Sequence, residues 1–287
     1  MTDQAATLRV IRGGRPSKIF TAEHRRAIAV AGGKGGVGKS TVALNLAMAY
    51  AQSGARTLIV DTDLGMADLN LLLGVAPERS ILDALGGTPI EDILVNAYGL
   101  TLVPALNGSY LLSTIGPAAL KRILDMVATL GTEYDMLVVD VAAGIGQTQT
   151  TFAGATTDAI VVVNPEPLSM ADAYASLKVL ATEQRVQRAF LVPNRVTSRT
   201  QADELVARLT ALVDRFLDLE LVGLPYIPAD PKVAESAQIG VPLLVHAPES
   251  PAARAIRHLV RALATVAPMT AETASWWRSA RAQGETR

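Results

Sequence analysis

The sequence predicts an α/β fold in which helices flank a doubly wound, mostly parallel sheet, and three observations lead to this prediction. Apolar strand-like runs alternate with helical stretches between residues 27 and 267, a pattern typical of repeated β–α units. Hydrophobic residues make up 49% of the chain and aromatic residues only 4%, so we expect an aliphatic core, which suits a sheet covered on both faces. A glycine-rich segment lies between the first apolar run and a helical stretch, the setting of a phosphate-binding loop.

The expected strands and helices follow one another in chain order, and each is predicted from its apolar pattern. The first strand is expected at Ala27–Ala31, and the helix after it at Val42–Ala51, closed by Gly54. The later strands are expected at Thr57–Asp61, Leu100–Pro104, Met136–Asp140, Ala159–Asn164, Ala189–Pro193 and Leu219–Leu224. The later helices are expected at Pro117–Leu130, Met170–Gln184, Gln201–Phe216 and Pro251–Ala267, the last of which should dock on the sheet.

Changes in composition divide the chain into three segments. Residues 1–26 form a polar N-terminal arm with six cationic and two acidic residues, and its glycines and proline make a continuous helix improbable. Residues 27–267 form the nucleotide-binding domain. Residues 268–287 form a C-terminal tail with two tryptophans and several arginines.

Composition also excludes several kinds of function. The net charge of −1 argues against wholesale binding to nucleic acid, and no specific nucleic acid is expected. The absence of cysteine excludes disulfides, thiolate catalysis and cysteine-held iron–sulfur clusters. The N-terminus has no signal-peptide core, and prolines interrupt the uncharged stretch 93–120, so we expect a cytoplasmic protein without a membrane span.

Residues 32–41 read GGKGGVGKST and fit the phosphate-loop pattern from Gly33 to Ser40. In such a loop consecutive backbone N–H groups converge on phosphate oxygens, and glycines permit the close approach. Lys39 is expected to reach the β- and γ-phosphates and the Ser40 hydroxyl to reach Mg²⁺. The alternative is a glycine-rich turn with chance lysines. The residues expected to bind the nucleotide here are Gly33, Gly35, Gly36, Val37, Gly38, Lys39, Ser40 and Thr41.

Two strand ends place carboxylates where a bound nucleotide would face them. Asp61 and Asp63 stand two residues apart and point to the same side if the strand geometry persists. One of them can hold a Mg²⁺-bound water and the other can orient the attacking water. Asp140 ends a second apolar strand, with Gly144 close behind it. The alternative for each element is a turn whose aspartate caps the next helix.

Lys34 is a second lysine within the loop. A lysine this early cannot easily duplicate the work of Lys39, so it is a candidate to reach the nucleotide of a partner subunit, in the manner of an arginine finger supplied in trans. The alternative is a solvated lysine that the loop tolerates.

These elements together resemble the deviant Walker-A ATPases of the MinD/ParA class over residues 27–267, and 164–174 resembles its MinD and flagellar branch. The resemblance implies a sandwich dimer that binds ATP and releases as ADP forms. It implies that Lys34 contacts ATP across the dimer, that Asp63 orients the water, and that Ser40, Asp61 and Asp140 lie at Mg²⁺. It further implies that Asn194 contacts adenine and that a segment containing Pro225 and Ile227 closes over the base.

One departure from this family lies just after Asp140. The family usually has a small polar residue there, commonly followed by proline or glycine, whereas this chain has Val141 and Ala142. We therefore expect a different way of sensing the γ-phosphate and slow hydrolysis, stimulated by dimerisation or by partners.

Residues Asp3–Arg9 match the Asp-Gln-Ala-x-x-Leu-Arg motif of the FlhG family, also called FleN, the MinD-like regulators of flagellar number. The resemblance implies that this arm activates FlhF, a GTPase of the signal-recognition-particle type, and that the glutamine completes the GTPase site. The partner-binding residues would be Asp3, Gln4, Leu8 and Arg9. The alternative is a disordered leader.

The tail resembles the membrane-targeting ends of MinD and FlhG more weakly. Met269, Trp276, Trp277 and Ala280 form a short apolar face, with Arg278 and Arg281 beside it. We expect weak membrane contact that depends on dimerisation, since two weak anchors gain through avidity.

The leading hypothesis is therefore an ATP-dependent homodimer that regulates flagellar number or placement through an FlhF-like GTPase. Flagellar C-ring proteins or a transcription regulator are further candidate partners. Two alternatives stay open: a MinD/ParA-like positioning ATPase for division proteins, DNA or cargo, and a non-catalytic binding module that restrains a transcription regulator.

Overall fold

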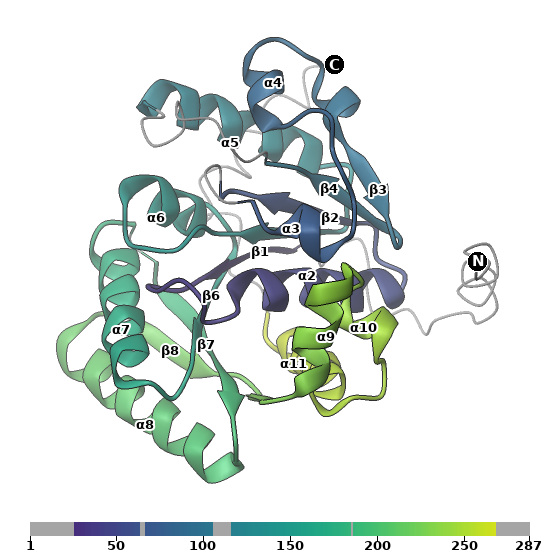
Figure 1. The fold of residues 1–287 in the computed structure, drawn as a ribbon. Helices are drawn as coiled ribbons and strands as arrows, with labels where there is room; N and C mark the ends of the chain where they lie inside the picture. The colour runs from purple at the N-terminus through teal and green to yellow at the C-terminus, as the bar shows by residue number, and fades with distance from the viewer. Residues whose placement is uncertain (1–25, 64–66, 106–115, 185, 268–287) are drawn as a thin grey trace.

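Nine strands form one sheet in the computed structural model, which describes residues 26–63, 67–105, 116–184 and 186–267. Within these residues the strand order is β3-β4-β2-β5-β1-β6-β7-β8, and β9 pairs with β7 (Figure 1). Each pairing is parallel except that of β3 with β4. Because the chain moves outward from β1 in both directions, the sheet is doubly wound, and the predicted fold class is confirmed.

The strands are β1 (Arg26–Ala31), β2 (Thr57–Asp61), β3 (Val95–Ala97), β4 (Leu100–Val103), β5 (Met136–Asp140), β6 (Asp158–Val163), β7 (Arg188–Val196), β8 (Glu220–Gly223) and β9 (Ile227–Pro228). The helices are α2 (Lys39–Gln52), α3 (Leu69–Leu72), α4 (Ile81–Leu85), the 3₁₀ helix η2 (Ile90–Ile93), α5 (Pro117–Gly131), α6 (Gln147–Gly154), α7 (Pro167–Thr182), α8 (Arg199–Phe216), α9 (Pro231–Ile239), α10 (Leu243–His246) and α11 (Pro251–Thr265).

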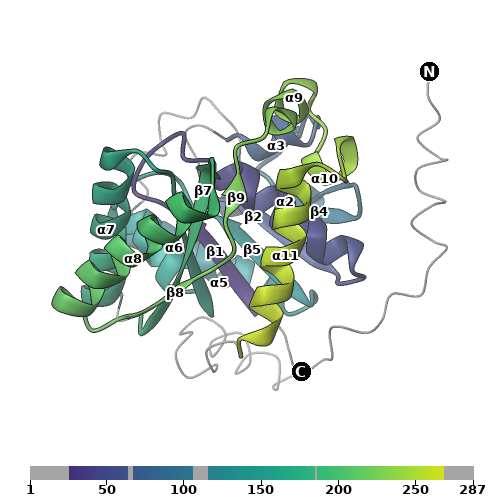
Figure 2. The same cartoon turned by 90° about the horizontal axis from the view of Figure 1, so that it is seen from below.

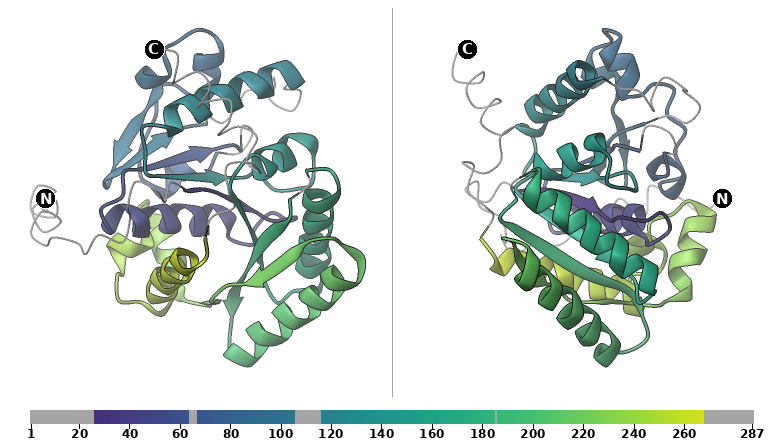
Figure 3. Two further views of the ribbon diagram at one scale, coloured as in Figure 1. Left: turned by 180° about the vertical axis from the view of Figure 1, so that it is seen from behind. Right: turned by 90° about the vertical axis from the view of Figure 1, so that its left-hand side faces the viewer.

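Helices cover both faces of the sheet, and β1 shows how one strand serves both layers. Its alternate residues point to opposite faces. Ala27 and Ala29 join the core beneath α4 to α8, whereas Ile28 and Val30 join the core beneath α2, α10 and α11. Figures 2 and 3 show these two helical layers on either side of the sheet. Fully buried strands with continuous apolar sequences follow from this arrangement.

The predicted strands β2 and β5 have the expected bounds, and the other predicted strands and helices lie within a few residues of theirs. The hairpin of β3 and β4 was not predicted. Its turn residues Tyr98 and Gly99 both have positive φ, as a two-residue hairpin turn requires, but a tyrosine in that conformation is a poor sequence signal. The short elements α3, α4, η2, α6, α9, α10 and β9 were also not predicted.

The first strand begins one residue earlier than predicted. Arg26, assigned to the arm, is the first residue of β1 and is 5% exposed. Its guanidinium lies 2.7 Å from the carboxylate of Asp158, itself 1% exposed, and it also donates to the carbonyls of Leu263 and Val266. The buried carboxylate makes a cation tolerable at this position.

Asp158 also pairs with a second arginine, which contacts the C-terminal end of the described domain. Arg188 lies 3.5 Å from the second oxygen of Asp158 and donates to the carbonyl of Ala267. Two guanidiniums thus bind carbonyls at the C-terminal end of α11, where positive charge is favourable. The described chain therefore enters at Arg26 and leaves at Ala267 beside one carboxylate, at the amino ends of the strands.

Among the described residues, no helix combines the length and the apolar character that crossing a membrane requires.

The substitution Asp158→Asn is expected to lower the free energy of unfolding by about 3–5 kcal/mol, because it leaves Arg26 buried without a counter-charge. Denaturant unfolding followed by circular dichroism measures the loss. The control Asp125→Asn removes an exposed pair with Lys121 and should cost below about 1 kcal/mol. Equal, small losses for both variants would contradict this account of the cluster.

Candidate functional site

The glycine-rich loop leads from the carboxyl end of β1 into α2, which begins at Lys39. Gly38 precedes that helix with φ at 96°, and Gly36 has φ at 79°, a conformation that side chains disfavour. No side chain caps the first turn of α2, and no acidic residue occupies it. The N–H groups there are consequently suited to an anion.

Two glycines allow the loop to approach other elements closely. A Cβ at Gly33 would lie 2.1 Å from the backbone carbonyl oxygen of Asp172 in α7. A Cβ at Gly38 would lie 2.4 Å from the side-chain nitrogen of Asn194 in β7. At Gly35, by contrast, a Cβ would meet nothing within 4 Å. The loop is therefore held between α7 and β7, while its tip is open.

Lys39 is turned back into the loop. Its Nζ donates to the carbonyl oxygen of Lys34 at 3.0 Å, and the residue is 7% exposed. Burial lowers the pKa of Lys39, while Asp140, Asp63 and Asp68 oppose this by favouring the charged form. The ammonium thus lies inside the loop, with three carboxylates near enough to act on it.

Asp61 and Asp140 are neighbours in register across β2 and β5, and both are buried. Burial raises the pKa of Asp61 to about 7, although hydrogen bonds from the N–H groups of Asp63 and Leu69 work against this rise. Burial likewise raises the pKa of Asp140 well above its ordinary value, and a hydrogen bond with Ser40 lowers it. A cation between these groups would stabilise their charged forms.

The same residues pass a chemical test for Mg²⁺. Ser40, Asp61 and Asp140 offer hydroxyl and carboxylate oxygens, which are the ligands that Mg²⁺ prefers. The Oδ1 atom of Asp140 is buried and has no hydrogen-bond partner among the described residues. An orphaned buried acceptor is costly unless something pairs with it, so this donor set fits a cation.

Asp63 stands two residues after Asp61 and is only half-buried. Its N–H donates to Oδ1 of Asp61 at 2.9 Å, which fixes the turn at the end of β2. Thr62, between them, donates from its hydroxyl to the carbonyl of Asp140 at 2.7 Å and so ties the two strand ends together. Asp63 thus lies beside the two buried carboxylates and near Lys39.

Lys34 lies on the outside of the loop. Its Nζ is 3.0 Å from Oε2 of Glu166, and the two side chains are 37% and 58% exposed. Oε1 of Glu166 accepts a hydrogen bond from the side-chain amide of Asn164 at 3.2 Å, which orients the carboxylate. Glu166 had no predicted role, because only the fold brings residues so far apart in sequence together.

The residues predicted to hold the base lie in two places. Asn194 donates from Nδ2 to the carbonyl of Val37 at 2.8 Å, and it pairs in register with Ile227 of β9. Pro225 instead lines a pocket between α8 and α11 that contains no loop residue. The structure therefore joins Asn194 and Ile227 to the loop, and Pro225 to a neighbouring pocket.

The partner-binding residues predicted in the arm, Asp3, Gln4, Leu8 and Arg9, lie outside the described residues, as do the tryptophans of the tail.

Comparison with known proteins points to one family. The ParA family model, described as NUBPL iron-transfer P-loop NTPase, matches residues 23–264. The antiactivator FleN of Pseudomonas aeruginosa is 38% identical over 213 residues, which cover 74% of this chain and 76% of FleN. The flagellum site-determining protein YlxH of Helicobacter pylori is 33% identical over 214 residues, which cover 73% of this chain and 72% of YlxH.

Solved structures agree with this family. The septum site-determining protein MinD of Pyrococcus horikoshii, complexed with Mg-ADP, has a TM-score of 0.69 and 27% identity, and the match covers 83% of this chain and 95% of that one. The iron transfer named for the family model has no cysteine ligand to use in this chain, which contains none.

Substituting Gly33→Ala is expected to lower the free energy of unfolding by about 1–3 kcal/mol, since the added methyl group overlaps the backbone of α7. Thermal and denaturant unfolding of the nucleotide-free protein measure the effect. Gly35→Ala is the matched control, and its stability should change by less than about 1 kcal/mol because the methyl group enters open space. A Gly33→Ala variant as stable as the control would mean that the loop is not held against α7.

Proposed function

Because the chain belongs to the ParA family of P-loop NTPases, it is an ATPase that works with ATP and Mg²⁺, and we propose that it uses hydrolysis as a dimerisation switch in flagellar regulation. It is a positioning ATPase of the same family as FleN and MinD. ATP favours the dimer and ADP releases it, so the nucleotide acts as a ligand with different affinity for the two states.

The observation that carries the proposal is the position of Lys34. Lys39 already occupies the inside of the loop, whereas Lys34 stays outside it and partly exposed. Its partner in the single chain is Glu166, and an exposed ion pair of this kind is worth about 0–1 kcal/mol. A phosphate presented by a second subunit displaces Glu166 at small cost.

Exposed apolar side chains support a dimer face at the same edge of the sheet. Leu71 of α3 is 60% exposed, Ile145 after β5 is 47%, Leu168 of α7 is 69%, and Ile239 of α9 is 56%. Each lies on an element that follows the carboxyl end of a strand, and α3 packs against α9 (Figure 1). Exposed apolar side chains gathered at one edge of the sheet favour an interaction surface there.

We assign the site residues on this basis. Backbone N–H groups of Gly33, Gly35, Gly36, Val37, Gly38, Ser40 and Thr41 bind the phosphates, and Lys39 pairs with the β- and γ-phosphates. Ser40, Asp61 and Asp140 hold Mg²⁺, directly or through water. When bound, Mg²⁺ neutralises charge on the phosphates. Asp63 orients the attacking water, Lys34 stabilises the transferring phosphoryl group of the partner's ATP, and Asn194, Pro225 and Ile227 surround the base.

The segment after Asp140 accounts for slow turnover. The N–H of Val141 donates to the carbonyl of Val30 at 3.0 Å, and the residue is 2% exposed. This N–H is therefore committed to the sheet and is not offered to the γ-phosphate. Gly144, with φ at 111°, is the first flexible position beyond it, so γ-phosphate sensing falls later in the loop.

The partner is an FlhF-like GTPase of the signal-recognition-particle type, bound through Asp3, Gln4, Leu8 and Arg9. The sequence motif and the flagellar relatives FleN and YlxH support this choice. The arm joins the domain at Arg26, at the amino end of β1 and away from the loop. A partner can consequently engage the arm while the opposite edge is in a dimer.

A second role is favoured by the name of one relative. FleN is an antiactivator, so restraint of a transcription activator is the second candidate function for this chain, compatible with the first. Flagellar C-ring proteins are further candidate partners. We further propose that the protein is cytoplasmic and that residues 268–287 make weak contact with the membrane in the dimer.

Substitutions at two residues separate the steps of the switch. Asp63→Ala should trap an ATP-bound dimer and lower ATP turnover by about 10²–10⁴-fold, as loss of a water-activating group does. Lys34→Ala should weaken the dimer while sparing binding of nucleotide by the monomer. Light scattering, fluorescent-nucleotide titration and phosphate release measure these effects.

Lys121→Ala is the control for Lys34→Ala, because Lys121 is an exposed lysine on α5 whose loss should change neither property. An Asp63→Ala variant that stays monomeric with ATP would count against the sandwich dimer.

Activation of the GTPase tests the proposed partner. The chain should stimulate GTP hydrolysis by the flagellar signal-recognition-type GTPase by about 10²-fold, at the low end of what a positioned catalytic group contributes. Gln4→Ala should abolish stimulation. Thr7→Ala changes a variable position of the motif and should retain it. If Gln4→Ala stimulates as well as the unmodified chain, the arm does not complete the GTPase site.

A further inference from the structure

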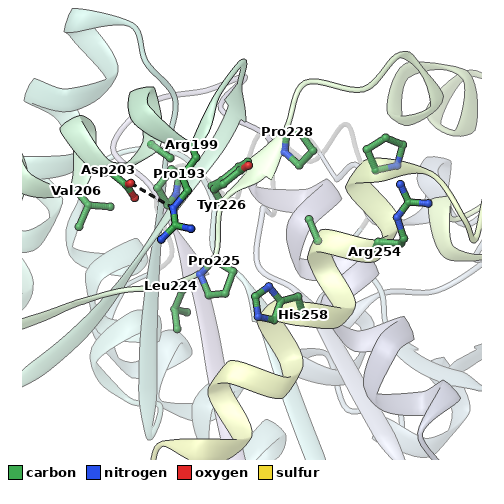
Figure 4. A pocket seen from close by; sticks show the side chains of 13 residues that line it. Pro193, Arg199, Asp203, Val206, Leu224, Pro225, Tyr226, Pro228, Arg254 and His258 are labelled. Carbon is green, nitrogen blue, oxygen red and sulfur yellow. Dashed lines mark ion pairs between the residues drawn. The ribbon is translucent and has the colours of Figure 1, made fainter.

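A pocket of about 590 Å³ lies between α8 and α11, where the chain passes from β8 to β9. Its volume is within the range of small-molecule sites, about 300–1,000 Å³. Figure 4 shows Arg199 of α8 on one side of the Pro225–Tyr226 segment, and Arg254 and His258 of α11 on the other. None of the residues assigned to phosphate or Mg²⁺ lines it, and Pro225 is the one lining residue that we also assign to the base, so the pocket adjoins the proposed nucleotide site.

The lining combines flat apolar surfaces with cationic groups. Prolines, Tyr226 and aliphatic side chains make up most of the wall. Arg254 is oriented by its hydrogen bond to the carbonyl of Glu249 at 2.7 Å, whereas Arg199 forms an exposed ion pair of 3.5 Å with Asp203. Asp203 is the one carboxylate in the lining. Oriented guanidiniums suit planar anions and also stack on aromatic faces.

We propose that this pocket binds a small organic anion with a flat apolar body and that its occupant changes the affinity of the loop for nucleotide. The anionic group, a carboxylate, phosphate or sulfonate, pairs with Arg254. The apolar body lies against Tyr226 and the prolines.

Two features favour a compact ligand over a protein segment. Pro225 and Pro228 have no N–H, so a strand cannot extend the sheet along this wall. A second hollow of about 470 Å³ adjoins the pocket along α8 and carries Asp203 and Asp214. Those carboxylates would repel an acidic chain that continued beyond the pocket.

A short path of contacts joins the pocket wall to the loop. Pro228 lines the pocket and belongs to β9, in which Ile227 pairs with Asn194. Asn194 donates to the carbonyl of Val37 and lies against Gly38. An occupant that shifts β9 therefore moves a side chain that touches the phosphate loop. Coupling of this kind is reciprocal, so nucleotide must change the affinity of the pocket equally.

The probe for the experiment is 1-anilinonaphthalene-8-sulfonate, a flat aromatic anion whose fluorescence rises on binding. The full chain is first saturated with Mg-ADP, so that the phosphate loop is filled. We expect saturable binding of one probe per chain. Arg254→Glu should weaken it at least tenfold, and Ala255→Trp, which fills the pocket without changing charge, should abolish it. Arg261→Glu makes the same charge change on α11 outside the lining and should alter binding less than twofold.

Coupling is measured by titrating a fluorescent ADP with and without saturating probe. The dissociation constant of ADP should change at least threefold in the unmodified chain and stay constant in Ala255→Trp. Binding that is unsaturable, that survives both pocket variants, or that falls equally in Arg261→Glu would overturn the site. An ADP affinity indifferent to the probe would overturn the coupling. Thermal unfolding confirms that each variant is folded. Neither Lys34 nor Asp63, on which the dimer proposal depends, is changed in this experiment, so its failure leaves that proposal intact.

Discussion

Two buried carboxylates, side by side at the carboxyl ends of β2 and β5, are the constraint on which the site depends. Parallel register places Asp61 opposite Asp140, and burial penalises the charge of both. Lys39 favours the charged form of Asp140, but Lys39 is itself buried. Because each group is costly alone, the site is organised around added positive charge, which Mg²⁺ supplies with ATP. The turn at Asp63 and the hydrogen bond from Thr62 to the carbonyl of Asp140 hold this arrangement.

The two edges of the sheet carry different clusters of charged residues. Strands that run parallel bring their carboxyl ends together, so the loop, the carboxylates and the exposed apolar side chains share one edge. The amino edge carries the opposite kind of cluster, in which one buried carboxylate, Asp158, holds two arginines and the end of α11. The first cluster is poised to accept a ligand, whereas the second is already neutralised. The arm and the tail, to which we assign partner binding, join the domain at this second edge, at Arg26 and Ala267.

Much of this was predictable because the signals are local. The bounds of β2 and β5 follow from continuous apolar runs that each end at an aspartate, and the loop lies where its motif requires. Contacts between distant residues were not predictable. The pair of Lys34 with Glu166 joins residues that are 132 apart in the sequence. Arg26 could be assigned to the arm from sequence because its partner, Asp158, is also 132 residues away. Pairing across elements depends on crossovers that no local pattern encodes.

The Lys34–Glu166 pair suggests how one loop can serve both a resting and a working state. A ligand shifts an equilibrium only by its difference in affinity for the two states. ADP and ATP differ by one phosphoryl group, so that group must bring the difference in the proposed switch. In the proposed switch, a γ-phosphate across the dimer would offer Lys34 more negative charge than Glu166 does, and loss of the phosphate would return Lys34 to its own chain. Because the exposed pair of Lys34 with Glu166 is worth only about 0–1 kcal/mol, it favours the monomer slightly and does not prevent the dimer from forming. If Lys34 had a stronger partner within its own chain, the monomer would be favoured even with ATP. If it had no partner there, dimerisation would differ less between ADP and ATP.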